Sequence, residues 1–247
     1  MNLESEYNGI DSNGSFWLAW RIKREKSWHT YWKYPGDVGV APMVEWSLPS
    51  GLVAEDLVFP PPKKVSMGKV RAYGHTGETL FLCRFRAQNP LPIGKKISIS
   101  GNFSWLTCSV TCLPGNAEMS IDLSVLQNPV PDPFCKPRFD SFRRERPIAC
   151  PNFWEAQAIE EPSRFLLKIP FHLFDSPSGI YFFNEGKNIL SNVPQPVSRY
   201  KGFWEISLKK SPWGKPQRYL KGLLYKADGW DSSAKSFYKL NLRLRAE

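Results

Sequence analysis

The residues best suited to chemistry are two of the five cysteines, Cys108 and Cys112, which are separated by three residues. Thr107, Val110 and Thr111, with the Pro-Gly pair that follows, favour a strand, loop or hairpin here over a helix. A local turn brings two sulfurs to bonding distance when the Cα atoms are roughly 4.4–6.8 Å apart. Such a short loop constrains the unfolded chain weakly. The spacing alone therefore fits a redox-active pair and a small structural disulfide equally well.

The other three cysteines suggest no exchange chemistry of their own. Cys83 lies between Phe81 and Phe85 on the apolar side of an expected strand, which predicts a buried, inert thiol. Cys135 and Cys150 flank a Pro-rich segment and are candidates for a separate structural bridge.

Metal and cofactor sites are weakly indicated. Structural zinc needs four ligands close together, and the histidines are scattered at His29, His75 and His172. No cofactor is expected. Copper binding by the thiolates of Cys108 and Cys112 with one histidine is an alternative, because soft ligands select Cu(I).

The elements that position these cysteines are predicted to be short strands. Apolar residues alternate with polar ones over 16–23, 119–124, 204–208 and 238–242, the pattern of half-buried strands. The 22 Pro and 17 Gly residues interrupt the chain often, which argues against long helices. Many short strands with turns between them point to β-sandwiches. Further strands are expected near 28–34, 43–48, 79–87, 96–103, 164–169, 180–184 and 219–226.

Two domains are expected from the length and from one interruption of the strand pattern. The Pro-rich residues 127–133 do not suit a central strand. A short helix is expected over 137–146, with Phe139 and Phe142 on one side. The prediction is a first domain at 1–128, a linker with this helix at 129–151, and a second β-sandwich at 152–247.

Charge and hydropathy exclude several function classes. The net charge of +10 comes largely from basic residues that alternate with apolar ones, as over 237–243, and these predict a solvated sheet face. No nucleic-acid-binding motif is present, so nucleic acid is not an expected partner. No run of about 18 apolar residues suits a membrane span. The acidic N-terminus does not read as a signal peptide, so we expect a cytosolic chain or one whose signal has been removed.

Three segments together, in this order, resemble the N-terminal periplasmic region of the DsbD family of thiol:disulfide interchange proteins, and most of all the branch that contains ScsB. The looser second half fits the same branch through residues 192–196 and 220–229. The likeness covers roughly 16–243. The three segments are Trp28-His29-Thr30-Tyr31-Trp32 with the Tyr34-Pro35-Gly36-Asp37 turn, Tyr73-Gly74-His75-Thr76-Gly77, and Trp105 through Pro114.

This resemblance implies an all-β protein of two immunoglobulin-like β-sandwich domains located in the periplasm. It implies a redox-active pair at Cys108 and Cys112, with Cys112 forming the mixed disulfides. Electrons would arrive from a transmembrane DsbD-type donor domain and pass to periplasmic thioredoxin-fold oxidoreductases. That membrane domain is missing from the given sequence, and contact with the membrane is expected only through it.

Four further residues are expected near the cysteines. A mobile loop at about 68–77, with Tyr73 and His75 at its tip, would cap the pair. His29 and Tyr31 would line the site, and a charged histidine would favour a thiolate. The rival hypothesis is a non-enzymatic tandem immunoglobulin-like binding module whose disulfides are structural.

Overall fold

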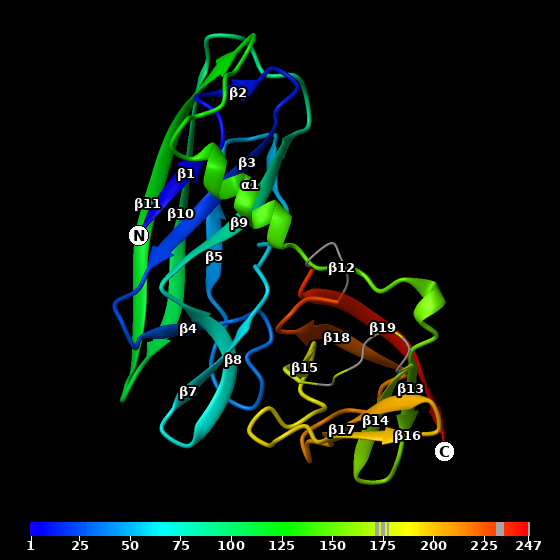
Figure 1. Cartoon of the computed structure of the whole chain (residues 1–247). Helices are drawn as coiled ribbons and strands as arrows, with labels where there is room; N and C mark the ends of the chain where they lie inside the picture. Colours follow the sequence, from blue (N-terminus) through cyan, green and yellow to red (C-terminus); the bar gives the residue numbers. More distant parts are fainter. Residues whose placement is uncertain (171–172, 174–175, 177, 231–234, 247) are drawn as a thin grey trace. The chain divides into compact units, whose positions relative to one another are not determined.

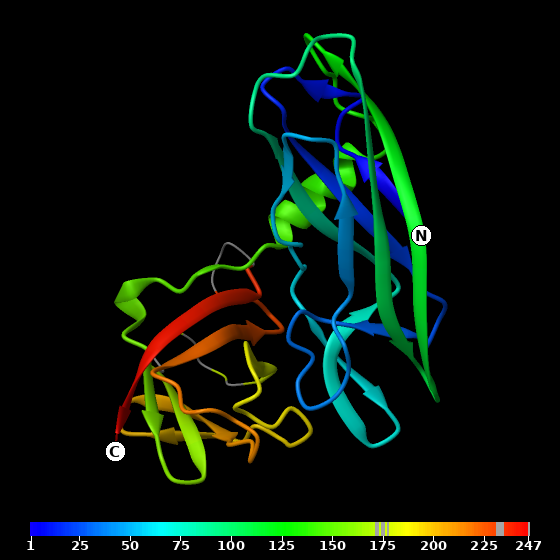
Figure 2. The same cartoon turned by 180° about the vertical axis from the view of Figure 1, so that it is seen from behind.

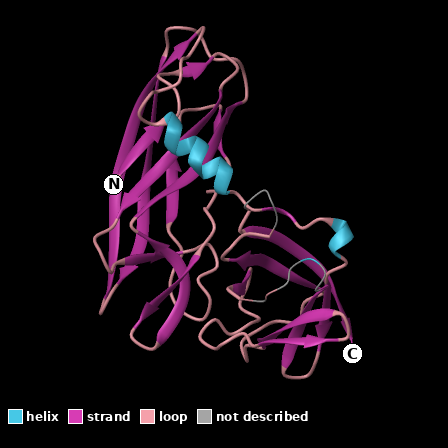
Figure 3. Cartoon of the chain, viewed as in Figure 1, coloured by secondary structure: helices cyan, strands magenta, loops and turns pink. Residues whose placement is uncertain are grey.

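A computed structural model describes residues 1–170, 173, 176, 178–230 and 235–246. Among these residues strands predominate, with one α-helix and one short 3₁₀ turn (Figure 3), and the predicted all-β, immunoglobulin-like fold is confirmed. The chain divides into two units that are discontinuous in sequence. The first comprises residues 1–33, 40–60 and 74–145, and the second comprises 34–39, 61–73 and 146–247.

The first sheet of unit 1 has the strand order β1-β3-β9-β6. Its centre is the antiparallel pair β3 and β9, in register from Ser15↔Arg86 to Lys23↔Glu78. The strands are β1 (Asn2–Ser5), β3 (Ser15–Lys23), β6 (Leu52–Ala54) and β9 (Glu78–Ala87).

The second sheet has the order β2-β11-β10-β4-β8-β7, and β5 pairs separately with β10 (Figures 1 and 2). Strand β7 and residues 70–73 of β8 are grouped with unit 2, and the remaining strands with unit 1. Its main component is the long hairpin of β10 and β11. The strands are β2 (Ile10–Asp11), β4 (His29–Tyr31), β5 (Met43–Ser47), β7 (Lys63–Met67), β8 (Val70–Thr76), β10 (Lys96–Cys108) and β11 (Cys112–Leu126).

The core of unit 1 lies between these two sheets, and aromatic rings join them. Trp20 of β3 stands 4.9 Å from Phe103 of β10 and 5.5 Å from Phe81 of β9, measured between ring centroids. Offset and edge contacts of this kind add to the apolar area that the rings bury. The alternation expected over 16–23 is confirmed, because residues 16, 18, 20 and 22 are all buried.

One helix, α1 (Lys136–Glu145), covers the other face of the first sheet. Its buried Phe139 and Phe142, as predicted, pack against Ala19, Leu80 and Leu82. This explains why Ala19 is buried even though it lies on the face of β3 that points away from the sandwich core.

Two buried carboxylates of the N-terminal segment hold the helix in place. Both Glu6 oxygens accept hydrogen bonds from the Arg143 guanidinium, at 2.6 and 2.5 Å. Glu4 accepts from Arg138 at 2.7 Å and from Arg21 of β3 at 3.1 Å. Burying a carboxylate is costly unless such charged donors compensate for the lost hydration.

Unit 2 is a second sandwich, built from a sheet with the order β15-β18-β19-β13-β14-β17-β16, with β12 beside β19. One layer contains β15 and β18, the other contains β13, β14, β17 and β16, and strand β19 pairs with both. Leu242 of β19 pairs with Leu220 of β18, while Leu244 pairs with Ala158 of β13. Residues from both layers form one core. The strands are β12 (Ile148–Ala149), β13 (Gln157–Glu160), β14 (Arg164–Pro170), β15 (Ile180–Asn184), β16 (Val197–Tyr200), β17 (Phe203–Lys209), β18 (Tyr219–Lys226) and β19 (Phe237–Ala246), and the 3₁₀ turn η1 spans Asn152–Trp154.

The observed division differs from the continuous domains 1–128, 129–151 and 152–247 in two respects. Residues 34–39 and 61–73 group with unit 2, whereas the helix expected in the linker groups with unit 1. Tertiary contacts decide both, because Phe139 is buried against strands β3 and β9, which lie more than fifty residues earlier in the chain.

We predict that Phe139→Ala lowers the free energy of unfolding of unit 1 by about 3–5 kcal/mol, because the side chain is fully buried and its removal leaves a cavity. Phe134→Ala is the matched control: this ring is 79% exposed just before the same helix, so its loss should change stability by less than about 0.5 kcal/mol. Urea denaturation of both variants measures the difference. Equal stabilities would show that α1 does not contribute to the fold of unit 1.

Candidate active site: a disulfide at the tip of a hairpin

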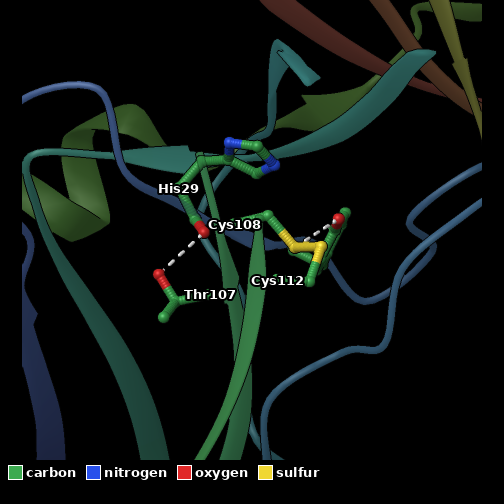
Figure 4. The surroundings of a disulfide bond; sticks show 5 residues. His29, Thr107, Cys108 and Cys112 are labelled. Atoms are coloured by element: carbon green, nitrogen blue, oxygen red, sulfur yellow. Dashed lines mark hydrogen bonds between the residues drawn. A yellow bond between two sulfur atoms is a disulfide. The ribbon is translucent and has the colours of Figure 1, made fainter. Parts of the chain in front are cut away.

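Cys108 and Cys112 form a disulfide at the end of the β10–β11 hairpin, with an S–S distance of 2.02 Å and a Cα–Cα distance of 4.1 Å (Figure 4). The strands are in antiparallel register from Lys96↔Ser124 to Cys108↔Cys112. The cysteines are therefore the last cross-strand pair, and Ser109, Val110 and Thr111 make the turn between them.

The strand alternation places this disulfide on the outer face of its sheet. In β10 the odd-numbered residues from Ile97 to Phe103 are buried in the core, and Thr107 continues this series. Cys108 belongs to the even-numbered series, so its side chain points away from the sandwich core. Its neighbour across the sheet, His29 of β4, lies on the same face.

Trp105 and Gly115 anchor the end of the hairpin to the core. They are cross-strand partners, and a Cβ atom at Gly115 would stand only 2.4 Å from the Trp105 indole, so only glycine fits beneath this ring. The Trp105 ring also meets Trp20 edge-on, with centroids 6.0 Å apart. The prediction that Trp105 fixes the strand before Cys108 agrees with these contacts.

The two sulfurs differ in access. Cys108 is fully buried, whereas Cys112 is partly exposed. Because thiol–disulfide exchange requires an in-line approach to one sulfur, an incoming partner reaches Cys112 more readily than Cys108.

Tyr31 is the side chain that contacts the disulfide from β4. Its hydroxyl donates a hydrogen bond to Cys108 Sγ at 3.1 Å. Burial raises the pKa of Tyr31, so the hydroxyl keeps its proton at neutral pH and remains a donor. The expectation that Tyr31 lines the cysteine site agrees with this geometry. After reduction, the same bond would favour the thiolate of Cys108.

His29 lies beside the site but does not supply a positive charge. Its ring packs edge-on against Tyr31, at 5.4 Å between centroids. Burial, and next the charge of Arg24, lower the pKa of His29, so the imidazole is neutral at pH 7. The expectation that a charged histidine assists the thiolate is therefore not supported at this position.

Arg24 is a residue that the sequence analysis missed. Its guanidinium donates to Thr30 Oγ1 at 2.7 Å and to Thr79 Oγ1 at 3.0 Å, and burial lowers its pKa to about 10. It remains charged at neutral pH and acts through space on His29. The local sequence does not show that Arg24 lies near the site, because one of its partners, Thr79 of β9, is more than fifty residues away in the chain.

The predicted capping loop at 68–77 is wrong. Residues 70–76 form strand β8, and the turn of the β7–β8 hairpin falls at Gly68 and Lys69. Tyr73 is buried in unit 2, where its ring packs edge-on against Phe183 at 5.0 Å.

His75 is likewise buried rather than at a loop tip. It pairs with Thr30 and packs on Phe81 of the unit 1 core, at 5.6 Å between centroids. Because Thr30 pairs in turn with Thr107, His75 lies on the face of the sheet opposite to the disulfide. Tyr73 and His75 are thus not brought together with the cysteines as a cap.

The remaining cysteines are free thiols. Cys83 is buried as predicted, and burial is the main cause that raises its pKa to about 12. Burial also raises the pKa of Cys135 and of Cys150 to about 11. The bridge considered between Cys135 and Cys150 is not formed.

Within the described parts of the chain, no cluster of three or more His, Cys, Asp or Glu side chains is arranged to hold a metal ion. His172, one of the histidines considered for copper, lies outside the described residues. No helix among the described residues is long and apolar enough to cross a membrane.

Comparison with known proteins places this geometry in a family. Residues 5–124 match the family model described as the N-terminal part of the thiol:disulfide interchange protein DsbD. These residues are similar to a DsbD-type N-terminal domain. The family match thus covers the Cys108–Cys112 pair and its surroundings, and it assigns residues 5–124 to a thiol–disulfide interchange family.

One solved structure extends the likeness to the whole chain at the level of fold. The N-terminal periplasmic domain of ScsB from Proteus mirabilis superposes with a TM-score of 0.64 at 14% sequence identity, over 97% of this chain and 99% of that one. The periplasmic chaperone SfaE aligns over both full chains at 9% identity, with a TM-score of only 0.24. No protein of curated function matches the sequence significantly.

We predict that Tyr31→Phe raises the pKa of Cys108 in the reduced protein by about one unit, because it removes a hydrogen bond to the thiolate worth ~1.4 kcal/mol. The measurement is the ultraviolet absorbance of the thiolate against pH in a Cys112→Ser background. The other thiols, whose pKa values are raised to about 11 or 12, stay protonated over most of that titration.

The control for this titration is Tyr219→Phe, a substitution at an exposed tyrosine of unit 2. It should leave the Cys108 titration unchanged. An unchanged pKa in the Tyr31→Phe variant would mean that the hydroxyl does not interact with the thiolate.

Proposed function

We propose that this chain is a periplasmic thiol:disulfide oxidoreductase domain of the protein-disulfide reductase type. In this proposal Cys108 and Cys112 relay electrons from a transmembrane DsbD-type domain to thioredoxin-fold partners. The observation that carries the proposal is the Cys108–Cys112 disulfide at the tip of a hairpin, where it closes a loop of only five residues.

The hairpin has other means of closure. Backbone pairing continues along β10 and β11 up to the cysteines, and the Trp105 indole packs over Gly115. In the chain-entropy model, a disulfide that closes a loop of only five residues stabilises the folded state by about 2 kcal/mol, whereas one that closes a 100-residue loop stabilises it by about 4.7 kcal/mol. A bond with so small a structural role can open and close while the sandwich stays folded.

The exchange reaction follows from the difference in access. In the reduced domain the Cys112 thiolate attacks a partner disulfide, and one partner sulfur leaves as a thiolate. The mixed disulfide is resolved when the Cys108 thiolate attacks Cys112 Sγ and expels the second partner sulfur. Two electrons pass to the partner, and the Cys108–Cys112 bond forms again.

The proposed location and partners rest on the family match and the ScsB likeness. The matched ScsB domain is described as periplasmic, and disulfides persist in oxidising compartments such as the periplasm. A transmembrane donor domain and thioredoxin-fold acceptors are what DsbD-family membership implies for such a domain.

We predict that the Cys108–Cys112 bond is reduced by mild reductant without loss of fold. Its potential should lie well above the roughly −300 mV that is typical of structural bridges. Redox titration followed by thiol alkylation gives the potential, and circular dichroism monitors the fold. A potential below that value, or unfolding on reduction, would support the rival binding-module hypothesis.

Substitution of each cysteine assigns the two roles. We predict that Cys108→Ser accumulates a stable mixed disulfide through Cys112 with a thioredoxin-fold protein, because the resolving thiol is gone. Cys112→Ser should trap little, since the remaining sulfur is buried. Non-reducing electrophoresis detects the adduct.

Cys83→Ser is the matched control for these variants and should exchange like the unmodified protein, because that thiol is buried and its pKa is raised to about 12. Trapping by Cys112→Ser alone would reverse the assigned roles. Trapping by neither variant would contradict the proposed function.

A further inference from the structure

Val110 occupies an unusual position beside the disulfide. It is the middle residue of the three-residue turn that the disulfide closes, and 92% of its surface is exposed. Exposed turns normally favour Gly, Asn, Asp or Ser, whose backbones and side chains suit the bend. The Val110 side chain buries almost no apolar surface within this chain, so that surface is available to a second protein.

The exchange reaction itself brings a partner close to this residue. A mixed disulfide at Cys112 requires the Cα atom of the partner cysteine to approach the Cα of Cys112 to roughly 4.4–6.8 Å. Val110 is two residues from Cys112, and consecutive Cα atoms are about 3.8 Å apart. The chain that flanks the partner cysteine therefore comes close to Val110 whenever the sulfurs are joined.

The hairpin end that carries this turn has no charged residue of its own. Between Lys96 and Glu118 the sequence contains no Asp, Glu, Lys, Arg or His, although 23% of the whole chain is charged. The nearest imidazole, His29, is kept neutral by its lowered pKa. A partner that docks here meets an uncharged hairpin end with two exposed aliphatic side chains, Val110 at the turn and Leu113 beside Cys112, of which Val110 is the more exposed.

We propose that Val110 is the docking residue of the exchange reaction, and that it is buried against an uncharged, apolar surface beside the cysteine of a thioredoxin-fold partner. This inference rests on the proposed function and identifies the kind of surface that the partner presents. Recognition at the tip is by apolar burial and not by charge pairing.

The test compares a protein reductant with a small one. Reduction of the Cys108–Cys112 bond is followed with reduced thioredoxin as the protein probe and with dithiothreitol as the reference, and the ratio of the two rate constants is taken for each variant. The ratio removes any effect of a substitution on the intrinsic reactivity of the disulfide. The variants are Val110→Ser, Val110→Asp and Val110→Lys.

We expect all three substitutions to lower this ratio, the two charged ones by about tenfold, which corresponds to ~1.4 kcal/mol of lost apolar burial. The matched control is Val53→Lys, at a half-exposed valine of strand β6 in the other sheet, and it should leave the ratio unchanged.

Each other outcome has a distinct meaning. Unchanged ratios in all three Val110 variants would overturn the docking role. Opposite effects of Asp and Lys would show electrostatic recognition and would also overturn it. If the unmodified protein reacts with thioredoxin no faster than with dithiothreitol, the proposed function itself fails, independently of Val110.

Discussion

The antiparallel register of β10 and β11 is the constraint on which the rest of the site depends. Because the two strands pair without interruption from Lys96 to Cys108, the two cysteines face each other at the end of the ladder. The same register places Gly115 under the Trp105 ring, which ties the tip to the core. A shift of one residue would turn the sulfurs toward the opposite face and separate them.

The side chains described beside the disulfide, Tyr31 and His29, are uncharged at neutral pH. The Tyr31 hydroxyl donates a hydrogen bond to Cys108, and the His29 imidazole packs against Tyr31. The nearby cation, Arg24, is held by neutral oxygens of Thr30, Gly77 and Thr79. Activation of a cysteine in such a place relies on a hydrogen bond to sulfur more than on an adjacent ion pair. The stronger charge pairing of unit 1 lies elsewhere, where buried Glu4 and Glu6 bind the arginines of α1. Stability and chemistry thus use different charged groups of the same sandwich.

Unit 2 holds its own network of polar contacts around an early loop of the chain. The Asp37 carboxylate accepts hydrogen bonds from the backbone N–H groups of Ser191 and Asn192, at 2.9 and 3.0 Å. A Cβ atom at Gly36, whose φ is +91°, would stand 2.3 Å from Ser191 Oγ, so glycine is required at this close approach. The Pro35-Gly36-Asp37 turn, read from sequence as a simple turn, therefore belongs to the packing of the second sandwich.

The sequence by itself determined the strands with clear alternation, the helix with its two buried phenylalanines, and the Cys108–Cys112 pair as the place of interest, because these are local patterns with local causes. It did not reveal β8, because the segment 68–77, with glycines at 68, 74 and 77, resembles a loop until pairing with β4 satisfies its backbone. It did not reveal Arg24, or the neutrality of His29, or the face on which His75 lies. Those features depend on which residues distant in the chain become neighbours, and on the burial that follows, and only the tertiary structure decides them.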